Sequence, residues 1–209
     1  RLLQALPVGG ISAYLPNPYL APRTLLLALS EELGLAVNAD SDDYHLLQSL
    51  NHALLAHAAE GRQVVVCIDE AQAMPLETLE SLRLLSNLET EKRKLLQIVL
   101  FGQPELDRKL AEPSVRQLLQ RIAFHYRLGG LAREEVANYL AHRLRVAGYR
   151  GEDVFGPRAV RCLHRASRGT PRLLNILAHK SLLAVYGEGQ HAVRPSHVRQ
   201  AAGDTAGAS

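Results

Sequence analysis

The run Val64–Ile68 (VVVCI) constrains the fold more than any other segment of this 209-residue chain. Its residues are all apolar and most are β-branched, which favours a β-strand. Because no polar residue alternates with the apolar ones, both faces of the strand must be covered, as in the centre of a parallel sheet. Asp69 and Glu70 follow directly. We therefore expect an α/β sheet with two carboxylates at its carboxyl edge, where open α/β folds bind their ligands.

Short apolar runs and stretches of helical periodicity surround this strand up to about residue 130. Further strands are predicted at 10–15, 95–101 and, as a short segment, 123–128. Helices are predicted at 21–33, 41–60, 75–88, 105–110 and 114–121. Ser41 and Asp42 are both suited to cap the second of these helices.

After Gly129-Gly130 the pattern predicts only helices. They are expected at 132–147, 157–167, 171–186 and 195–202. Strands alternating with helices, followed by helices alone, indicate a sheet domain and then a small helical bundle. We expect the sheet domain over residues 1–129 and a helical lid over 130–209.

The composition limits the setting in which the chain works. No apolar run approaches the ~20 residues that a membrane-spanning helix needs. Cys67 and Cys162 share no short metal-binding or redox spacing. We therefore expect a cytoplasmic protein, tethered to a membrane only if segments beyond these residues provide an anchor.

The net charge of +3 is unevenly distributed. From Gly130 onward there are 12 Lys+Arg against 6 Asp+Glu, whereas residues 1–129 hold 12 against 15. The basic part suits an anionic nucleotide or a nucleic acid, but an ordinary solvated arginine-rich surface explains it equally. We favour the solvated surface, because no aromatic residues that would stack on bases are interleaved with the arginines.

The acidic pair Asp69-Glu70 has the residue types that nucleoside triphosphate hydrolysis requires. Successive strand residues point in different directions, so Asp69 is free to hold Mg²⁺ while Glu70 faces the attacking water. The alternative is a pair of solvated carboxylates that cap the next turn. Gln103, at the end of the next predicted strand, is placed to bind the terminal phosphate or the water, although a simple turn residue is the alternative.

Two arginines are candidates for contacts with phosphate. Arg121 closes a predicted helix, where it could reach the nucleotide of a neighbouring subunit; Arg116 competes for this role, and a favourable interaction with the helix dipole is the alternative. Arg172 follows Thr170 and Pro171, the expected N-cap and first residue of a lid helix. A cation in a first helical turn opposes the dipole, which suggests an anionic partner.

Together these stretches resemble the AAA+ ATPases of the general secretion pathway protein A family, which includes the ATPase of MSHA pilus biogenesis. The matching segments are LPNPYLAPRTLLLALSEELGL (15–35), VVVCIDEAQ (64–72), LRLLSNLET (82–90), LLQIVLFGQPEL (95–106), LLQRIAFHYRLGGL (118–131) and GTPRLLNILAHKSLLAVY (169–186). The resemblance covers nearly the whole chain. It implies a P-loop NTPase core with a parallel sheet and a helical lid.

The resemblance also implies roles for single residues. Asp69 and Glu70 correspond to the Walker B pair, with Asp69 on Mg²⁺ and Glu70 on the water. Gln103 corresponds to the first sensor, Arg121 to the arginine finger and Arg172 to the second sensor, which contacts the nucleotide. The implied cofactors are ATP and Mg²⁺, and the implied assembly is a homo-oligomeric ring through Arg121. One departure is Ala73, where relatives often carry Asn.

The largest departure is the phosphate-binding loop. No Gly-x-x-x-x-Gly-Lys-Ser/Thr motif occurs in the sequence, and Arg1-Leu2-Leu3 resembles the first helix just past that motif. We interpret this as truncation before or at the loop, because a decayed ATPase is expected to lose Asp69, Glu70 and Arg172 as well. The sheet core is then expected to lack its first strand, and these 209 residues are expected to be inactive on their own.

Three functions remain open at this stage. The resemblance implies an ATPase that supports assembly of a type II secretion or type IV pilus machine at the envelope, with proteins of that machine as partners. A DNA-associated ATPase, such as a transposition or initiator-like factor, shares the same core. The third is a catalytically inactive interaction module.

Overall fold

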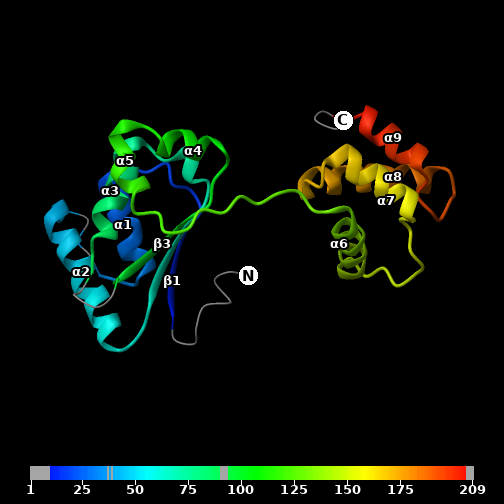
Figure 1. Cartoon of the computed structure of the whole chain (residues 1–209). Coiled ribbons are helices and arrows are strands. Elements are labelled where there is room, and N and C mark those ends of the chain that lie inside the picture. Colours follow the sequence, from blue (N-terminus) through cyan, green and yellow to red (C-terminus); the bar gives the residue numbers. More distant parts are fainter. Residues whose placement is uncertain (1–9, 37, 39, 90–93, 206–209) are drawn as a thin grey trace. The chain divides into compact units, whose positions relative to one another are not determined.

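The computed structural model describes residues 10–36, 38, 40–89 and 94–205. The helix start expected at residues 1–3 lies outside these ranges. The chain divides into two compact units between His125 and Tyr126, slightly before the boundary predicted at Gly129-Gly130. Each unit is described by itself (Figure 1).

The first unit contains a three-stranded parallel sheet in the order β1-β2-β3, which confirms the predicted sheet. The strands are β1 (Ile11–Leu15), β2 (Val64–Ile68) and β3 (Leu96–Leu100). All residues of the central strand β2 are buried. Leu15, Ile68 and Leu100 are paired across the sheet, so the three strands end at the same edge.

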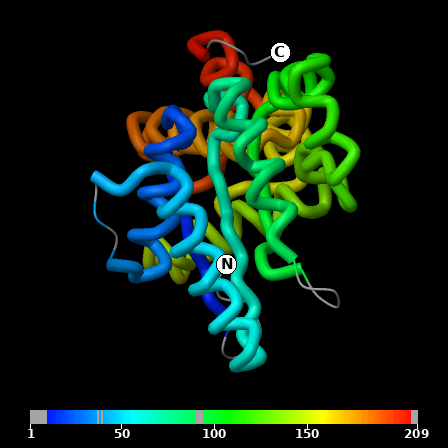
Figure 2. Tube along the Cα trace, turned by 90° about the vertical axis from the view of Figure 1, so that its left-hand side faces the viewer, coloured from blue at the N-terminus to red at the C-terminus, as the bar shows by residue number. Residues whose placement is uncertain are grey.

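Helices connect the strands and cover one face of the sheet. They are α1 (Pro22–Glu32), α2 (Asp43–Ala59), α3 (Leu76–Ser86), α4 (Glu105–Leu110) and α5 (Arg116–Leu119), with 3-10 turns η2 (Ala71–Ala73) and η3 (Pro113–Val115). Figure 2 looks onto the layer formed by α1, α2 and α3. Fully buried leucines from these helices, Leu25, Leu29, Leu46, Leu50, Leu54, Leu79, Leu82 and Leu85, pack against Ala13, Val66 and Ile68 of the sheet.

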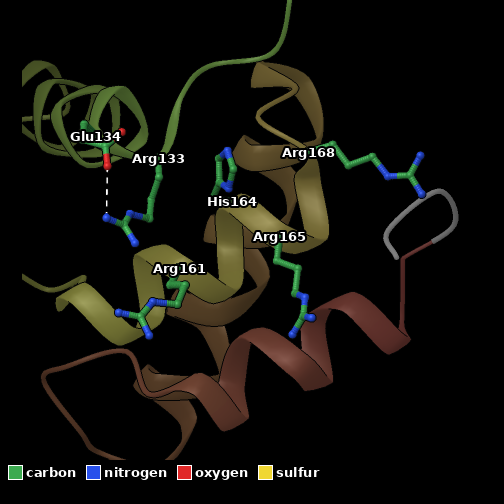
Figure 3. A pocket seen from close by; sticks show the side chains of 6 residues that line it. All are labelled: Arg133, Glu134, Arg161, His164, Arg165 and Arg168. Carbon is green, nitrogen blue, oxygen red and sulfur yellow. Dashed lines mark ion pairs between the residues drawn. The ribbon is translucent and has the colours of Figure 1, made fainter.

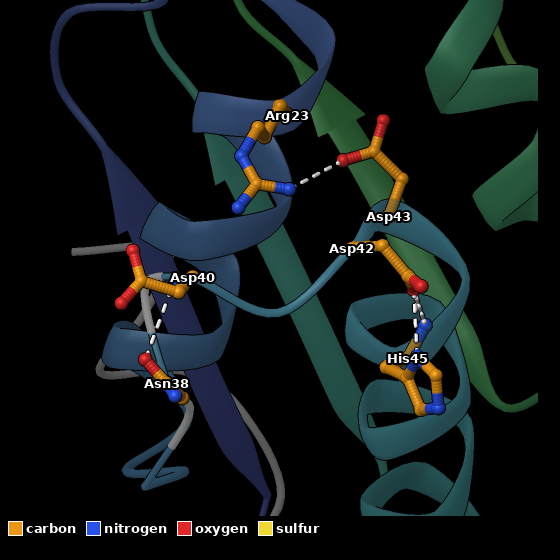
Figure 4. A network of polar contacts seen from close by, with 6 residues as sticks. All are labelled: Arg23, Asn38, Asp40, Asp42, Asp43 and His45. Carbon is orange, nitrogen blue, oxygen red and sulfur yellow. Dashed lines mark hydrogen bonds and ion pairs between the residues drawn. The ribbon is translucent and has the colours of Figure 1, made fainter.

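The start of α2 shows how local chemistry fixes one of these helices. Asp42 is the N-cap, and its carboxylate accepts a hydrogen bond of 2.9 Å from the backbone N–H of His45. Arg23 of α1 forms an ion pair of 2.8 Å with Asp43, which ties the two helices together (Figure 4). Of the two predicted capping residues, Asp42 therefore performs the role.

Two predictions for this region are wrong. Residues 123–128 form no strand, because a strand requires a hydrogen-bonded partner and none of the described residues pairs with this segment. Phe124, Tyr126 and Leu128 are 94%, 83% and 86% exposed. The helix predicted at 114–121 is also interrupted, since Val115, at φ −115° and ψ 10°, leaves the helical range and separates η3 from α5.

The second unit consists of helices packed around their own core, as predicted. They are α6 (Arg133–Val146), α7 (Pro157–Ser167), α8 (Pro171–Gly187) and α9 (Pro195–Gly203). The last three begin with proline, whose fixed φ suits the first helical position. Val136, Leu163, Leu174 and Leu177 are fully buried between the helices.

The segment before α6 crosses the start of α8 at very short range. The backbone N–H of Leu131 donates a 2.8 Å hydrogen bond to the carbonyl of Gly169. A Cβ on Gly169 would lie 2.2 Å from the carbonyl oxygen of Leu131, and the φ of Gly169 is +74°. Only glycine fits this crossing.

No helix in the described part of the chain combines the length and apolar character that crossing a bilayer requires.

Candidate functional site

At the carboxyl edge of the sheet, backbone hydrogen bonds hold the predicted acidic pair, Asp69 and Glu70, in place. The backbone N–H of Asp69 donates to the carbonyl of Leu15 at 2.9 Å, and that of Ala71 donates to the carbonyl of Phe101 at 2.8 Å. Asp69 is thereby held beside the end of β1, and the turn after Glu70 is held beside the end of β3.

Asp69 points toward β1. Its Oδ2 accepts a hydrogen bond of 3.1 Å from the hydroxyl of Tyr14, and its Oδ1 accepts one of 2.9 Å from the N–H of Glu70. The hydrogen bond to Asp69 raises the pKa of Tyr14 above its ordinary value. Each carboxylate oxygen retains a second lone pair, and the residue is half-exposed. Asp69 therefore has acceptor capacity for a cation or an ordered water.

Glu70 points toward β3 and is held by two amide side chains. Its Oε2 accepts a hydrogen bond of 3.2 Å from Nε2 of Gln103 and another from Nε2 of Gln72. Oε1 of Gln72 in turn accepts a 3.0 Å hydrogen bond from the backbone N–H of Gln103. The exposed carboxylate of Glu70 thus has a defined direction despite its position at the surface.

The backbone at Glu70 is in the left-handed helical region, with φ 50° and ψ 35°. A non-glycine residue in this region costs about 1–2 kcal/mol. Nearby, a Cβ on Gly102 would lie 2.8 Å from Leu106 Cδ2 and 3.1 Å from Gln72 Oε1. The absence of a side chain at Gly102 therefore gives the Gln72 side chain the space to contact both Glu70 and Gln103.

The donor set of this edge limits what it can bind. No group of three His, Cys, Asp or Glu side chains suited to a metal occurs among the described residues. A hard cation such as Mg²⁺ is commonly held by one or two carboxylates together with water and substrate phosphates. Asp69 fits that mode of binding.

Arg121 does not join this cluster. It is exposed and follows α5. The hydrogen bond from Lys94 lowers the pKa of Glu89, and the positive charge of Arg121 lowers it further. Glu89 and Lys94 precede β3, whereas Gln103 follows it. Since five strand residues span about 16 Å, Arg121 lies toward the opposite end of the sheet from the carboxylate pair of its own chain.

Arg172 lies in the second unit, in the first turn of α8. Thr170 is the N-cap of this helix, although its side chain accepts no capping hydrogen bond, and Pro171 is the first helical residue. Arg172 is exposed. The predicted competitor Arg116 is the first residue of α5 and is also exposed.

Sequence comparison decides the family. The profile of a family described as "AAA domain" matches residues 1–110, more than half of the chain. The chain belongs to this AAA domain family. It is also 42% identical over 206 residues to general secretion pathway protein A of Aeromonas hydrophila, a match that covers 99% of this chain and 38% of the relative. The chain thus spans well under half the length of that relative.

Solved structures share the fold of this AAA domain protein. The ORC2 protein of Aeropyrum pernix, in a structure of ADPNP–ADP complexes, has a TM-score of 0.64 at 18% identity, covering 92% of this chain and 52% of that one. Cdc6p of Pyrobaculum aerophilum has a TM-score of 0.65 at 14% identity, covering 94% and 53%. At these identities the likeness shows the fold, a P-loop AAA+ architecture.

Two residues of the AAA domain site were not predicted from the sequence. Tyr14 contacts Asp69 through the pairing of β1 with β2, and a sequence separation of 55 gives no local signal for that contact. Gln72 connects Glu70 with Gln103 and stands two residues after Glu70 in Asp-Glu-Ala-Gln. A polar amide two residues after the acidic pair was the available clue.

Proposed function

We propose that this AAA domain takes part in Mg²⁺-dependent ATP hydrolysis, with Asp69 as the metal-binding residue and Glu70 as the residue that orients the attacking water. The observation that carries the proposal is the cluster of Asp69, Glu70, Gln72 and Gln103 at the ends of β2 and β3. Its two carboxylates point toward different neighbouring strands, which suits two separate tasks.

In this proposal Asp69 would hold Mg²⁺, either directly or through water. Bound Mg²⁺ would neutralise charge that develops on the terminal phosphates. The hydrogen bond from Tyr14 of β1 fixes the orientation of the Asp69 carboxylate at the carboxyl edge of the sheet.

Glu70 then accepts a proton from, or orients, the water that attacks the terminal phosphate. Gln72 and Gln103 fix its direction before ATP arrives. Gln103 carries a further amide N–H with which to contact a phosphate oxygen, consistent with the sensor role that we assign to it.

We propose that a segment outside these 209 residues supplies the phosphate cradle, because the sequence contains no Gly-x-x-x-x-Gly-Lys-Ser/Thr motif. Arg172 of α8 is proposed to contact the nucleotide from the lid, which extends over residues 130–209. Arg121, remote from the carboxylate pair of its own chain, is proposed to act on the nucleotide of a neighbouring subunit in a homo-oligomeric ring.

The 42% identity to general secretion pathway protein A supports a role in secretion or pilus assembly at the envelope. We propose that the energy of ATP hydrolysis is used there, with proteins of that machine as partners and the AAA domain in the cytoplasm.

Asp69→Asn tests the metal half of the proposal in a protein that carries both this chain and a phosphate loop. We expect Mg²⁺-dependent binding of a fluorescent ATP analogue to weaken at least tenfold, because an amide oxygen is a much weaker ligand than a carboxylate. Glu31→Gln is the control, since Glu31 is an exposed carboxylate on α1 that is not part of the cluster of Asp69, Glu70, Gln72 and Gln103. The 209-residue chain alone should not bind ATP at micromolar concentration.

Unchanged Mg²⁺-dependent binding in the Asp69 variant would show that the acidic pair only caps the turn. Micromolar, Mg²⁺-dependent binding by the 209-residue chain would show that other groups hold the phosphates.

A further inference from the structure

The second unit carries an open hollow of ≈ 800 Å³ between α6 and α7. Its lining is almost entirely basic: Arg133, Glu134, Arg161, His164, Arg165 and Arg168 (Figure 3). None of these residues belongs to the carboxylate cluster of the first unit. The hollow is therefore a second candidate site, independent of the proposed ATPase chemistry.

Three of the arginines in the hollow have no acidic partner. Arg133 forms an ion pair of 3.1 Å with Glu134, so the only carboxylate of the lining is already engaged. Among the described residues, no ion pair involves Arg161, Arg165 or Arg168, and all three are exposed. Unpaired like charges repel one another, and an anionic partner would remove that repulsion.

The sequence of α7 gathers these charges on one side. Ala159, Val160, Leu163, Ala166 and Ser167 are buried in the core of the unit, whereas Arg161 and Arg165 are exposed. Arg161 and Arg165 are four residues apart and lie one above the other on that side. Arg168 follows the helix in the left-handed region, at φ 51°. Glycine or asparagine is the usual residue there.

The arrangement of the guanidinium groups indicates the shape of the ligand. Figure 3 shows the guanidinium groups of Arg161, Arg165 and Arg168 well apart from one another, and the three side chains do not converge on one point. Arg161 and Arg168 are seven positions apart at the end of α7, a separation of about 10 Å along a helix axis. This corresponds to about three steps between successive phosphates on one strand of B-DNA, at 3.4 Å of axis per step. A single small anion would meet only one of the three arginines.

We propose that this hollow binds the phosphate backbone of double-stranded DNA. A membrane surface fits less well, because fewer arginines of a concave lining can contact a flat surface than can contact a cylindrical DNA duplex. Single-stranded nucleic acid fits less well too, because the described residues that line the hollow include no Phe, Tyr or Trp to stack on bases. Contacts limited to phosphates imply little preference for sequence.

The test measures binding of the 209-residue chain to a 25-base-pair duplex of arbitrary sequence over a range of salt concentrations. Three phosphate contacts predict a slope of log affinity against log salt of about −2.7, which is about a 40-fold loss between 50 and 200 mM. The triple change Arg161→Ala, Arg165→Ala and Arg168→Ala should lower affinity at 50 mM salt at least tenfold and bring the slope close to zero.

A control of equal charge separates the hollow from general electrostatics. Arg143, Arg145 and Arg199 are exposed arginines of the same unit outside the lining, and their joint replacement by alanine changes net charge equally. Arg168→Gly alone keeps the left-handed backbone and removes one guanidinium, so it should reduce the slope without loss of stability. Equal effects of the two triple changes, or no duplex binding at 50 mM salt, would refute the proposal. Binding to phosphatidylserine vesicles in preference to duplex DNA would also refute it.

Discussion

Replacing Glu70 by glycine should give a more stable protein than replacing it by alanine if its backbone is strained as described. Both changes remove the hydrogen bonds from Gln72 and Gln103, so these losses cancel in the comparison. At φ 50° alanine retains the left-handed penalty of about 1–2 kcal/mol, whereas glycine does not. Glycine loses ~0.5–1 kcal/mol more backbone entropy on folding. We expect the glycine variant to be more stable by about 1 kcal/mol.

Amide hydrogen exchange of the buried β2 residues measures this difference in the first unit directly, because those amides report the opening of its core. A difference of about 1 kcal/mol corresponds to about fivefold slower exchange in the glycine variant. Gln48, exposed within α2, is the matched position with ordinary helical backbone. There glycine should be less stable than alanine by about 1 kcal/mol. The same order at both positions would refute the strained geometry at Glu70.

Two further predictions concern single contacts. Gly169→Ala should destabilise the second unit by more than about 2 kcal/mol in urea unfolding, because its Cβ would lie 2.2 Å from the Leu131 carbonyl oxygen; a loss below 0.5 kcal/mol would contradict the crossing. Tyr14 should ionise at higher pH than an ordinary tyrosine, because the hydrogen bond to Asp69 raises its pKa. The stability that this hydrogen bond contributes should therefore be present below about pH 10 and be lost as the pH rises above it. Ultraviolet titration against Tyr14→Phe measures this pKa, and Asp69→Asn should lower it; an unchanged pKa would exclude the contact.

The elements with continuous apolar patterns could be predicted from the sequence. The run at β2 and the leucine spacing of α2 depend on burial alone, so local pattern was sufficient. The segment 123–128 (AFHYRL) alternates apolar and polar residues as a half-buried strand does, yet strand formation depends on a partner that the local sequence does not reveal. Propensity is insufficient there, because the hydrogen bonds of a strand are made with another segment.

The same distinction applies to the site. Asp69, Glu70 and Gln103 lie within three residues of the ends of apolar strands, so their place at the carboxyl edge could be inferred from the order of elements. Tyr14 was missed because its contact depends on the register of β1 against β2, in which Tyr14 is paired with Cys67. The unpaired arginines of α7 were visible as charge, but their common hollow depends on how α6 and α7 pack.

The most direct test of the central claim is the rate of ATP hydrolysis by Glu70→Gln in a protein that joins this chain to a phosphate loop. The substitution retains the size of the side chain but removes its negative charge and, with it, its ability to accept a proton. We predict that ATP binding stays within about threefold of the unchanged protein while turnover falls by at least about a hundredfold. Turnover that stays the same would contradict the account, because Glu70 would then be a structural residue at the end of β2.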